Sequence, residues 1–151
     1  MEKISVSPKL YFYVEAKTTL NHVKEFAEKQ AHEVFQEAAK AGLEKTGPLE
    51  FIYFNASMDR EQEVTLQVAL PVKEAKQTDE HFHYRKATNF PCLSHRHRGA
   101  IRQIDQVYDE LFEHIWNQSI KINNEIREVH HTFEGVESSN NLTEIQIGLG
   151  N

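Results

Sequence analysis

The sequence lacks three features that would assign it to a class at once: a long apolar run, a second cysteine and an excess of basic residues. No run approaches the roughly 18 apolar residues of a membrane span, and residues 1–8 contain no apolar segment typical of a secretory signal. The lone Cys92 has no partner for an internal disulfide, which favours a reducing cytosol. Lys and Arg total 17 against 23 Asp and Glu, and this net charge of −6 argues against direct nucleic-acid binding.

What is present is the composition of a globular domain. The 151 residues are 39% hydrophobic and 26% charged, and a chain of this length buries roughly 70% of the surface that it exposes when unfolded. Stability therefore needs neither a disulfide nor a structural metal. We expect one cytoplasmic domain over residues 1–151, with no membrane partner and no cofactor.

Strand and helix patterns follow one another in the first half of the chain. Residues 9–15 combine aromatic and branched side chains, as strands do, whereas apolar residues from about 21 to 41 recur at helical spacing. Gly42 is placed to end this helix. Two further strands are predicted at 50–56 and 63–72, joined by the polar hairpin segment 57–62.

The second half repeats this order after a charged linker at about 73–80. Its predicted elements are an extended segment at 81–98 interrupted by Pro91, a helix that Gly99 opens, and strands at 125–133 and 142–149. Residues 65–70 (TLQVAL) also align with residues 144–149 (EIQIGL), at an offset of 79. The predicted fold class is α+β. Two pseudo-symmetric βαββ repeats, about 9–72 and 81–149, form an antiparallel sheet with two helices on one face and a ligand groove between the halves.

Alternation along the strands separates two faces of this sheet. The side chains expected to pack against the helices are Leu10, Phe12, Val14, Leu66, Val68, Leu70, Ile145, Ile147 and Leu149. Tyr11, Tyr13 and Glu15 point the other way. Phe51 and Tyr53 share a face, but Ile52 and Phe54 opposite them are equally apolar, so the pattern does not decide which face it is.

The face without helices is predicted to collect tyrosines, glutamines and one acidic residue, Glu144. Aromatic walls with few polar groups are typical of small-molecule sites. A carboxylate there is costly to keep ionised, so burial is expected to raise its pKa, and a cationic ligand would relieve that cost. Aromatic faces would add cation–π attraction of about 0.5–2 kcal/mol each. The alternative interpretation is that Glu144 is a solvated strand residue.

Several segments together resemble the GyrI-like family, which comprises stand-alone proteins and the effector-binding domains of bacterial transcription activators. The segment 63–72 (EVTLQVALPV) is similar to the strand that closes the family's first repeat. The stretch 97–99 (HRG), followed by Tyr108, Leu111 and Trp116, resembles the start of its second helix. Glu128-Val129 and the stretch 143–147 (TEIQI) resemble its last two strands. The resemblance spans Tyr11 to Leu149.

The resemblance implies two βαββ repeats with a pocket between them, and an acidic residue on the last strand, Glu144 here, that receives cationic amphipathic aromatic molecules. Family members act as multidrug sensors, as inhibitors of DNA gyrase, or as hydrolases of cyclopropane-bearing natural products. Two positions depart from the pattern. His130 stands where a tyrosine is usual, and the closing strand ends in Gly148-Leu149 where proline-valine is usual.

Three functional hypotheses remain open. The leading one is a stand-alone drug-binding module for multidrug sensing or sequestration, with Glu144 as the counter-ion. The other ligand-binding residues are then Tyr13, Tyr53, Phe51, Trp116, Tyr108 and His130. The second hypothesis is a hydrolase in which Glu144 activates water and a tyrosine acts as the acid. The third is binding to a protein partner, such as a transcription regulator or gyrase.

Three other features are better explained by structure than by chemistry. His81 and His83, like His95 and His97, lie two residues apart, but nearby arginines would repel a divalent cation, so no metal site is predicted. Cys92 is expected to be a small buried hydrophobic residue. Core packing is the default for Tyr108 and Trp116, although Trp116 lies close enough to the helix end to form a groove wall.

Overall fold

The computed structural model describes residues 1–56 and 61–151, so residues 57–60 of the predicted hairpin segment lie outside the described residues. The elements are β1 (Glu2–Val6), β2 (Lys9–Thr19), α1 (Val23–Ala41), β3 (Glu50–Phe54), β4 (Glu63–Pro71), β5 (His83–Ala87), β6 (Phe90–Arg98), the 3-10 turn η1 (Ile101–Gln103), α2 (Ile104–Asn117), β7 (Ile122–Thr132) and β8 (Leu142–Leu149). In this described part, neither helix is long and apolar enough to cross a membrane.

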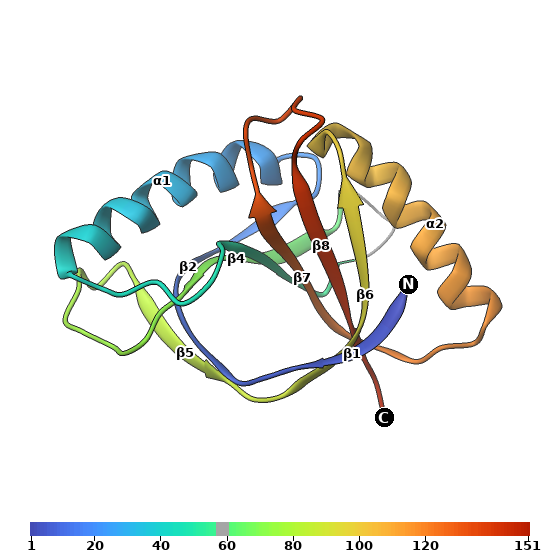
Figure 1. Cartoon of the computed structure of the whole chain (residues 1–151), viewed down its shortest axis with the longest axis horizontal. Helices are drawn as coiled ribbons and strands as arrows, with labels where there is room; N and C mark the ends of the chain where they lie inside the picture. Colours follow the sequence, from blue (N-terminus) through green and yellow to red (C-terminus); the bar gives the residue numbers. More distant parts are fainter. Residues whose placement is uncertain (57–60) are drawn as a thin grey trace.

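Eight strands form one curled sheet in the order β1-β6-β8-β7-β3-β4-β2-β5, and each neighbouring pair is antiparallel. The helices α1 and α2 lie on the same side of the sheet, one over each half, while the sheet curves away beneath them (Figure 1). This arrangement confirms the predicted α+β class with two helices on one face.

The two halves exchange their outermost strands. β1 comes from the first half and pairs with β6 of the second, whereas β5 comes from the second half and pairs with β2 of the first. At the centre, β3 pairs with β7. Neither exchange was predicted, because β1 has only five residues, three of them polar, and shows no clear alternation. The segment 73–80 contains no helix or strand.

The structure shows what Pro91, Gly42 and Gly99 do at the element boundaries predicted for them. Pro91 does not interrupt the extended segment. It lies inside β6 opposite Ser5, while the pairing of β6 with β8 begins only at Cys92, so the missing N–H breaks no bond between them. Gly42 ends α1 as predicted, with a left-handed φ of 71° and an N–H that donates to the Ala39 carbonyl. Gly99 is followed by η1 before α2 starts.

The predicted division of side chains between the faces is confirmed. The helix-facing core contains Phe12, Val14, Leu66, Val68, Leu70, Ile145 and Ile147, with Leu10 and Leu149 packed against it. Tyr11 belongs instead to a second cluster with Ile52, Ala69 and Ala87, and Tyr13 packs against that cluster. This cluster lies on the face of the sheet that points away from the helices, called the concave face below. Phe51 and Tyr53 face the helices, which decides the point that alternation left open.

Candidate functional site

A groove of about 2040 Å³ lies on the helix side of the sheet, between α1 and α2. Its floor comes from the two central strands, with Phe51 and Tyr53 on β3 and Ile126, Glu128 and His130 on β7. These side chains share one face because Phe51 is the register partner of Glu128, and Tyr53 that of Ile126. The walls come from α1 and α2. The groove therefore lies where the two halves of the chain meet, as predicted, but not on the face that was predicted.

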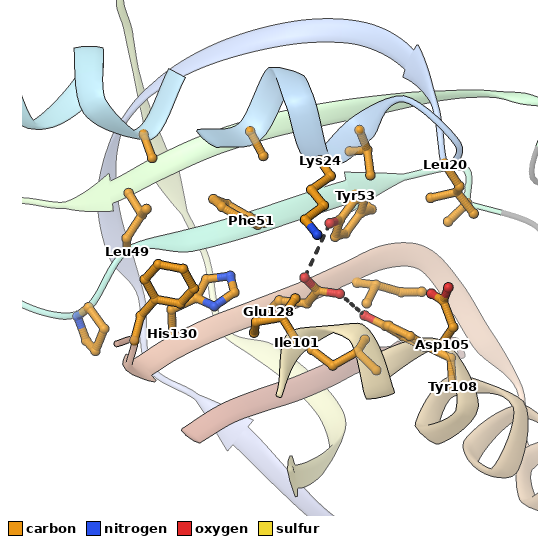
Figure 2. Close-up of a pocket in the computed structure, with 18 of the residues that line it drawn as sticks. Leu20, Lys24, Leu49, Phe51, Tyr53, Ile101, Asp105, Tyr108, Glu128 and His130 are labelled. Carbon is orange, nitrogen blue, oxygen red and sulfur yellow. Dashed lines mark hydrogen bonds between the residues drawn. The ribbon is translucent and has the colours of Figure 1, made fainter. Parts of the chain in front are cut away.

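Glu128 is the acidic group at the floor of the groove, and only 6% of it is exposed. The Tyr108 hydroxyl on α2 donates to Oε2 at 2.6 Å, and the Tyr53 hydroxyl on β3 donates to Oε1 at 3.3 Å (Figure 2). Burial raises the pKa of the carboxyl to about 7, although both hydrogen bonds pull it down and the nearby charge of Asp105 adds to the rise. Near neutral pH, Glu128 is thus poised between its two protonation states.

The two tyrosines hold their protons firmly. Burial, together with the negative charge of Glu128, raises the pKa of both Tyr53 and Tyr108 well above the ordinary value. Each hydroxyl therefore serves as a hydrogen-bond donor to the carboxylate. Tyr108 also stacks on Phe112, one helical turn further along α2, at 6.1 Å between ring centroids. The carboxyl group is enclosed by aromatic surface on the strand side and on the helix side.

His130 follows Glu128 on the same face of β7, two residues further along. Its ring meets the Phe51 ring edge to face at 4.4 Å and lies 6.5 Å from the Phe133 ring. Burial, together with a smaller effect of neighbouring His131, lowers the pKa of the imidazole to about 4, so the ring is neutral at pH 7. Its Nε2 is buried and has no hydrogen-bond partner among the described residues.

Five of the seven predicted ligand-binding residues line this groove: Phe51, Tyr53, Tyr108, Trp116 and His130. Trp116 sits near the end of α2 and is 85% exposed, so it forms part of the rim and does not pack in the core. Tyr13 does not line the groove. It lies on the concave face, where its ring is 5.7 Å from that of His83 on β5.

Glu144 lies on the concave face as well, because its register partner on β7 is Val129 and not Glu128. The Ser94 hydroxyl and the Gln146 amide donate to its Oε2 at 2.7 and 2.9 Å, and His131 Nε2 lies 2.8 Å from Oε1. Burial alone would raise the pKa of this carboxyl. The hydrogen bonds from Gln146, Ser94 and His131 outweigh burial and lower it to about 2, so the expected rise is wrong.

The concave face itself is filled, which corrects the expectation of a groove there. Arg127 crosses it with 2% of its side chain exposed, and Tyr11 and Glu50 are fully buried beside it. The Tyr11 hydroxyl donates to Glu50 at 2.7 Å, and Arg127 Nη1 donates to the Tyr11 hydroxyl at 3.1 Å. These side chains occupy the space that the sequence pattern assigned to a ligand.

Solved structures share this architecture over almost the whole chain. SAV2435 bound to tetraphenylphosphonium matches with a TM-score of 0.72 at 11% identity, covering 99% of this chain and 93% of that one. The C-terminal domain of EcmrR matches with a TM-score of 0.79 at 15% identity, covering 99% and 96%. A hydrolase encoded by lin2189 from Listeria innocua matches with a TM-score of 0.62 at 10% identity, covering 99% and 91%.

At these identities the three likenesses establish the fold. Among curated proteins, none matches the sequence. The family model of the GyrI-like small molecule binding domain, by contrast, matches residues 1–149, which is nearly every residue of the chain. This match shows that the chain belongs to the GyrI-like small molecule binding domain family, and the shared fold agrees with it.

Proposed function

We propose that this protein binds cationic, amphipathic aromatic molecules in the groove between α1 and α2, with Glu128 as the counter-ion. The observation that carries the proposal is that the buried Glu128 carboxylate forms no ion pair among the described residues, although the Lys24 side chain of α1 points in its direction (Figure 2). The carboxylate receives two tyrosine hydroxyls, but none of the ion pairs among the described residues involves it. A buried carboxylate without a cationic partner is unfavourable, and a bound cation would supply that partner.

The surroundings of Glu128 suit an aromatic cation better than a small hydrated one. Tyr53, Phe51 and Tyr108 present ring surface next to the carboxyl group (Figure 2). Such surface excludes water and adds cation–π attraction of about 0.5–2 kcal/mol for each suitably placed ring. The fold-level neighbour SAV2435 was solved with tetraphenylphosphonium, a cation of this kind, which supports the choice of probe.

The first test compares two carboxylates in one titration. Tetraphenylphosphonium and the uncharged triphenylphosphine oxide are titrated against the wild-type chain, Glu128→Gln and Glu144→Gln. We expect the wild type to bind the cation in preference, and Glu128→Gln to lose at least about tenfold in affinity, because a buried charge pair loses one partner. The matched variant Glu144→Gln, on the other face of the sheet, should bind as the wild type does.

Two results would contradict this assignment. Equal affinity for the charged and uncharged probes would remove the counter-ion from the mechanism. Loss of affinity in Glu144→Gln but not in Glu128→Gln would return the role to the residue that the sequence pattern suggested. The neighbour EcmrR has also been solved in a complex with DNA, and this chain covers 57% of that one. We infer that this domain does not itself bind DNA, because the 151 residues carry a net charge of −6.

Hydrolysis of an electrophilic small molecule is the second candidate, and the carboxyl pKa of about 7 favours it. Glu128 would take a proton from a water molecule as the water oxygen bonds to the electrophilic ring carbon. The strained carbon–carbon bond breaks in the same reaction, and the carbon that leaves takes up a proton from solvent. The raised pKa of Tyr53 and Tyr108 makes both poor acids for the leaving group, so we rank hydrolysis second. Incubation with an electrophilic cyclopropane, followed by mass spectrometry, would show a hydrated product only if the chain is a hydrolase.

A further inference from the structure

The groove contains a second polar feature that a simple aromatic cation leaves unused, namely the imidazole of His130. Residues 128 and 130 lie on the same face of β7, and two residues of a strand span about 6.6 Å. A single aromatic ligand bound at Glu128 can therefore reach both. Figure 2 shows the His130 ring beside Glu128 and Phe51 at the floor of the groove.

His130 Nε2 is buried, and no described residue forms a hydrogen bond with it. Its neighbours do not supply one, because Phe51 and Phe133 present only ring carbon to the imidazole. Buried polar atoms in folded proteins are nearly always paired, and one that is unpaired at a binding site is commonly completed by water or by ligand. The nitrogen lies in the lining of the groove, so it is positioned to be completed by a bound molecule.

The chemistry of the ring defines the complementary group. A neutral imidazole donates from one nitrogen and accepts at the other, and its tautomer adjusts to the partner. Burial keeps this ring neutral at pH 7, so it does not repel a cation held at Glu128. A hydroxyl or an amine can pair with either tautomer. An unsubstituted aryl group can pair with neither and would leave Nε2 unsatisfied.

We propose that His130 is a specificity-determining residue, and that the preferred ligands are aromatic cations with a hydroxyl or amine on the ring next to the charged centre. The inference rests on the proposed function, since it assumes that the cation is held at Glu128. It adds the class of substituent that the groove selects. A carboxylate provides attraction to many cations, whereas a fixed hydrogen-bonding atom distinguishes among them.

The experiment measures a ratio of affinities within each variant. Tetraphenylphosphonium and its para- and meta-hydroxyphenyl derivatives are titrated calorimetrically against the wild-type chain, His130→Phe and His130→Gln. We expect the wild type to prefer at least one hydroxyl derivative by about threefold to tenfold, the worth of one buried hydrogen bond. His130→Phe should bring the ratio to about one, and His130→Gln, which keeps a hydrogen-bonding group, should retain part of it.

A control histidine lies outside the groove. His83→Phe on β5 changes an exposed imidazole that lies tilted against the Tyr13 ring, and it should leave the ratio as in the wild type. Equal affinities for parent and hydroxyl derivatives in the wild type, or a preference that survives in His130→Phe, would overturn the role of His130 while leaving the cation site in place. Binding of none of these probes would overturn the proposed function and this inference with it.

Discussion

At the scale of single residues, two carboxyl groups of one sheet have acquired opposite properties. Glu128 and Glu144 are both 6% exposed. Glu144 receives three side-chain hydrogen bonds and its pKa falls to about 2, whereas Glu128 receives two and its pKa rises to about 7. The difference arises because Glu144 sits among an amide, a hydroxyl and an imidazole, and Glu128 sits among aromatic rings. The number of hydrogen bonds to each carboxyl group, and the polarity of the side chains around it, thus decide which carboxylate remains available to a ligand.

This contrast predicts how cation binding depends on pH. A cation binds the ionised form of Glu128, whose pKa is about 7, so affinity for tetraphenylphosphonium should fall about tenfold per unit below pH 7 and level off above it. At pH 6, binding should release close to one proton, about 0.9, because the carboxyl is mostly protonated before the cation arrives. Titration calorimetry in buffers of different ionisation enthalpy measures both quantities.

The control for this prediction is the same pair of variants. Glu144→Gln should keep the pH dependence, since a carboxyl whose pKa is about 2 does not titrate in this range. Glu128→Gln should bind weakly and with an affinity that does not vary between pH 5 and pH 8. A flat profile in the wild-type chain would show that Glu128 is not the titrating counter-ion.

At the scale of elements, the strands with one aliphatic and one polar face were predictable. β4 and β8 alternate cleanly, and their buried aliphatic residues pack under the helices as expected. β3 and β7 were not resolvable in this way, because each is buried on both faces near the centre of the sheet. Phe51 and Ile52 on β3 are equally apolar, so alternation could not assign the groove to either side.

The same ambiguity applies to Glu128, the acidic residue at the floor of the groove. The sequence of β7 does not alternate between charged and apolar residues, because the charged residues Arg127 and Glu128 are adjacent. Both are buried, one on each face of the sheet. A signal was nevertheless present. Ile126, Glu128 and His130 share one face of β7, and Ile126 belongs to the core that packs against the helices. A carboxylate on the same face as this core residue has little access to water. The clear alternation along β8 favours Glu144 instead.

At the scale of the whole molecule, one charged residue links distant strands across the concave face of the sheet. Arg127 belongs to β7, yet its guanidinium stacks on Phe90 of β6 at 3.8 Å and donates to Tyr11 of β2 at 3.1 Å. Those strands lie on opposite sides of β7 and are not its neighbours in the sheet. Arg127 also donates from Nε to Glu125 at 2.7 Å. One side chain thus connects both halves of the molecule beneath the groove.

This position predicts an asymmetric response to mutation. Arg127→Met should lower the free energy of unfolding by about 3 kcal/mol, because it leaves the mostly buried Glu125 carboxylate with only the longer contact to Arg85 at 3.8 Å. The double variant Arg127→Met with Glu125→Leu should recover most of that loss, since replacing both members of a buried ion pair by apolar residues is often close to neutral. Urea denaturation followed by tryptophan fluorescence and circular dichroism measures both values.

The two outcomes separate a structural tie from a passive buried charge. If the single variant loses less than about 1 kcal/mol, the guanidinium contributes little to holding the strands together. If the double variant stays as unstable as the single one, the contacts of Arg127 with Phe90 and Tyr11, and not its pairing with Glu125, are what stabilise the sheet. Recovery in the double variant would show that apolar side chains can replace the charge pair, and that stability needs neither the contact of Arg127 with Phe90 nor its hydrogen bond to Tyr11.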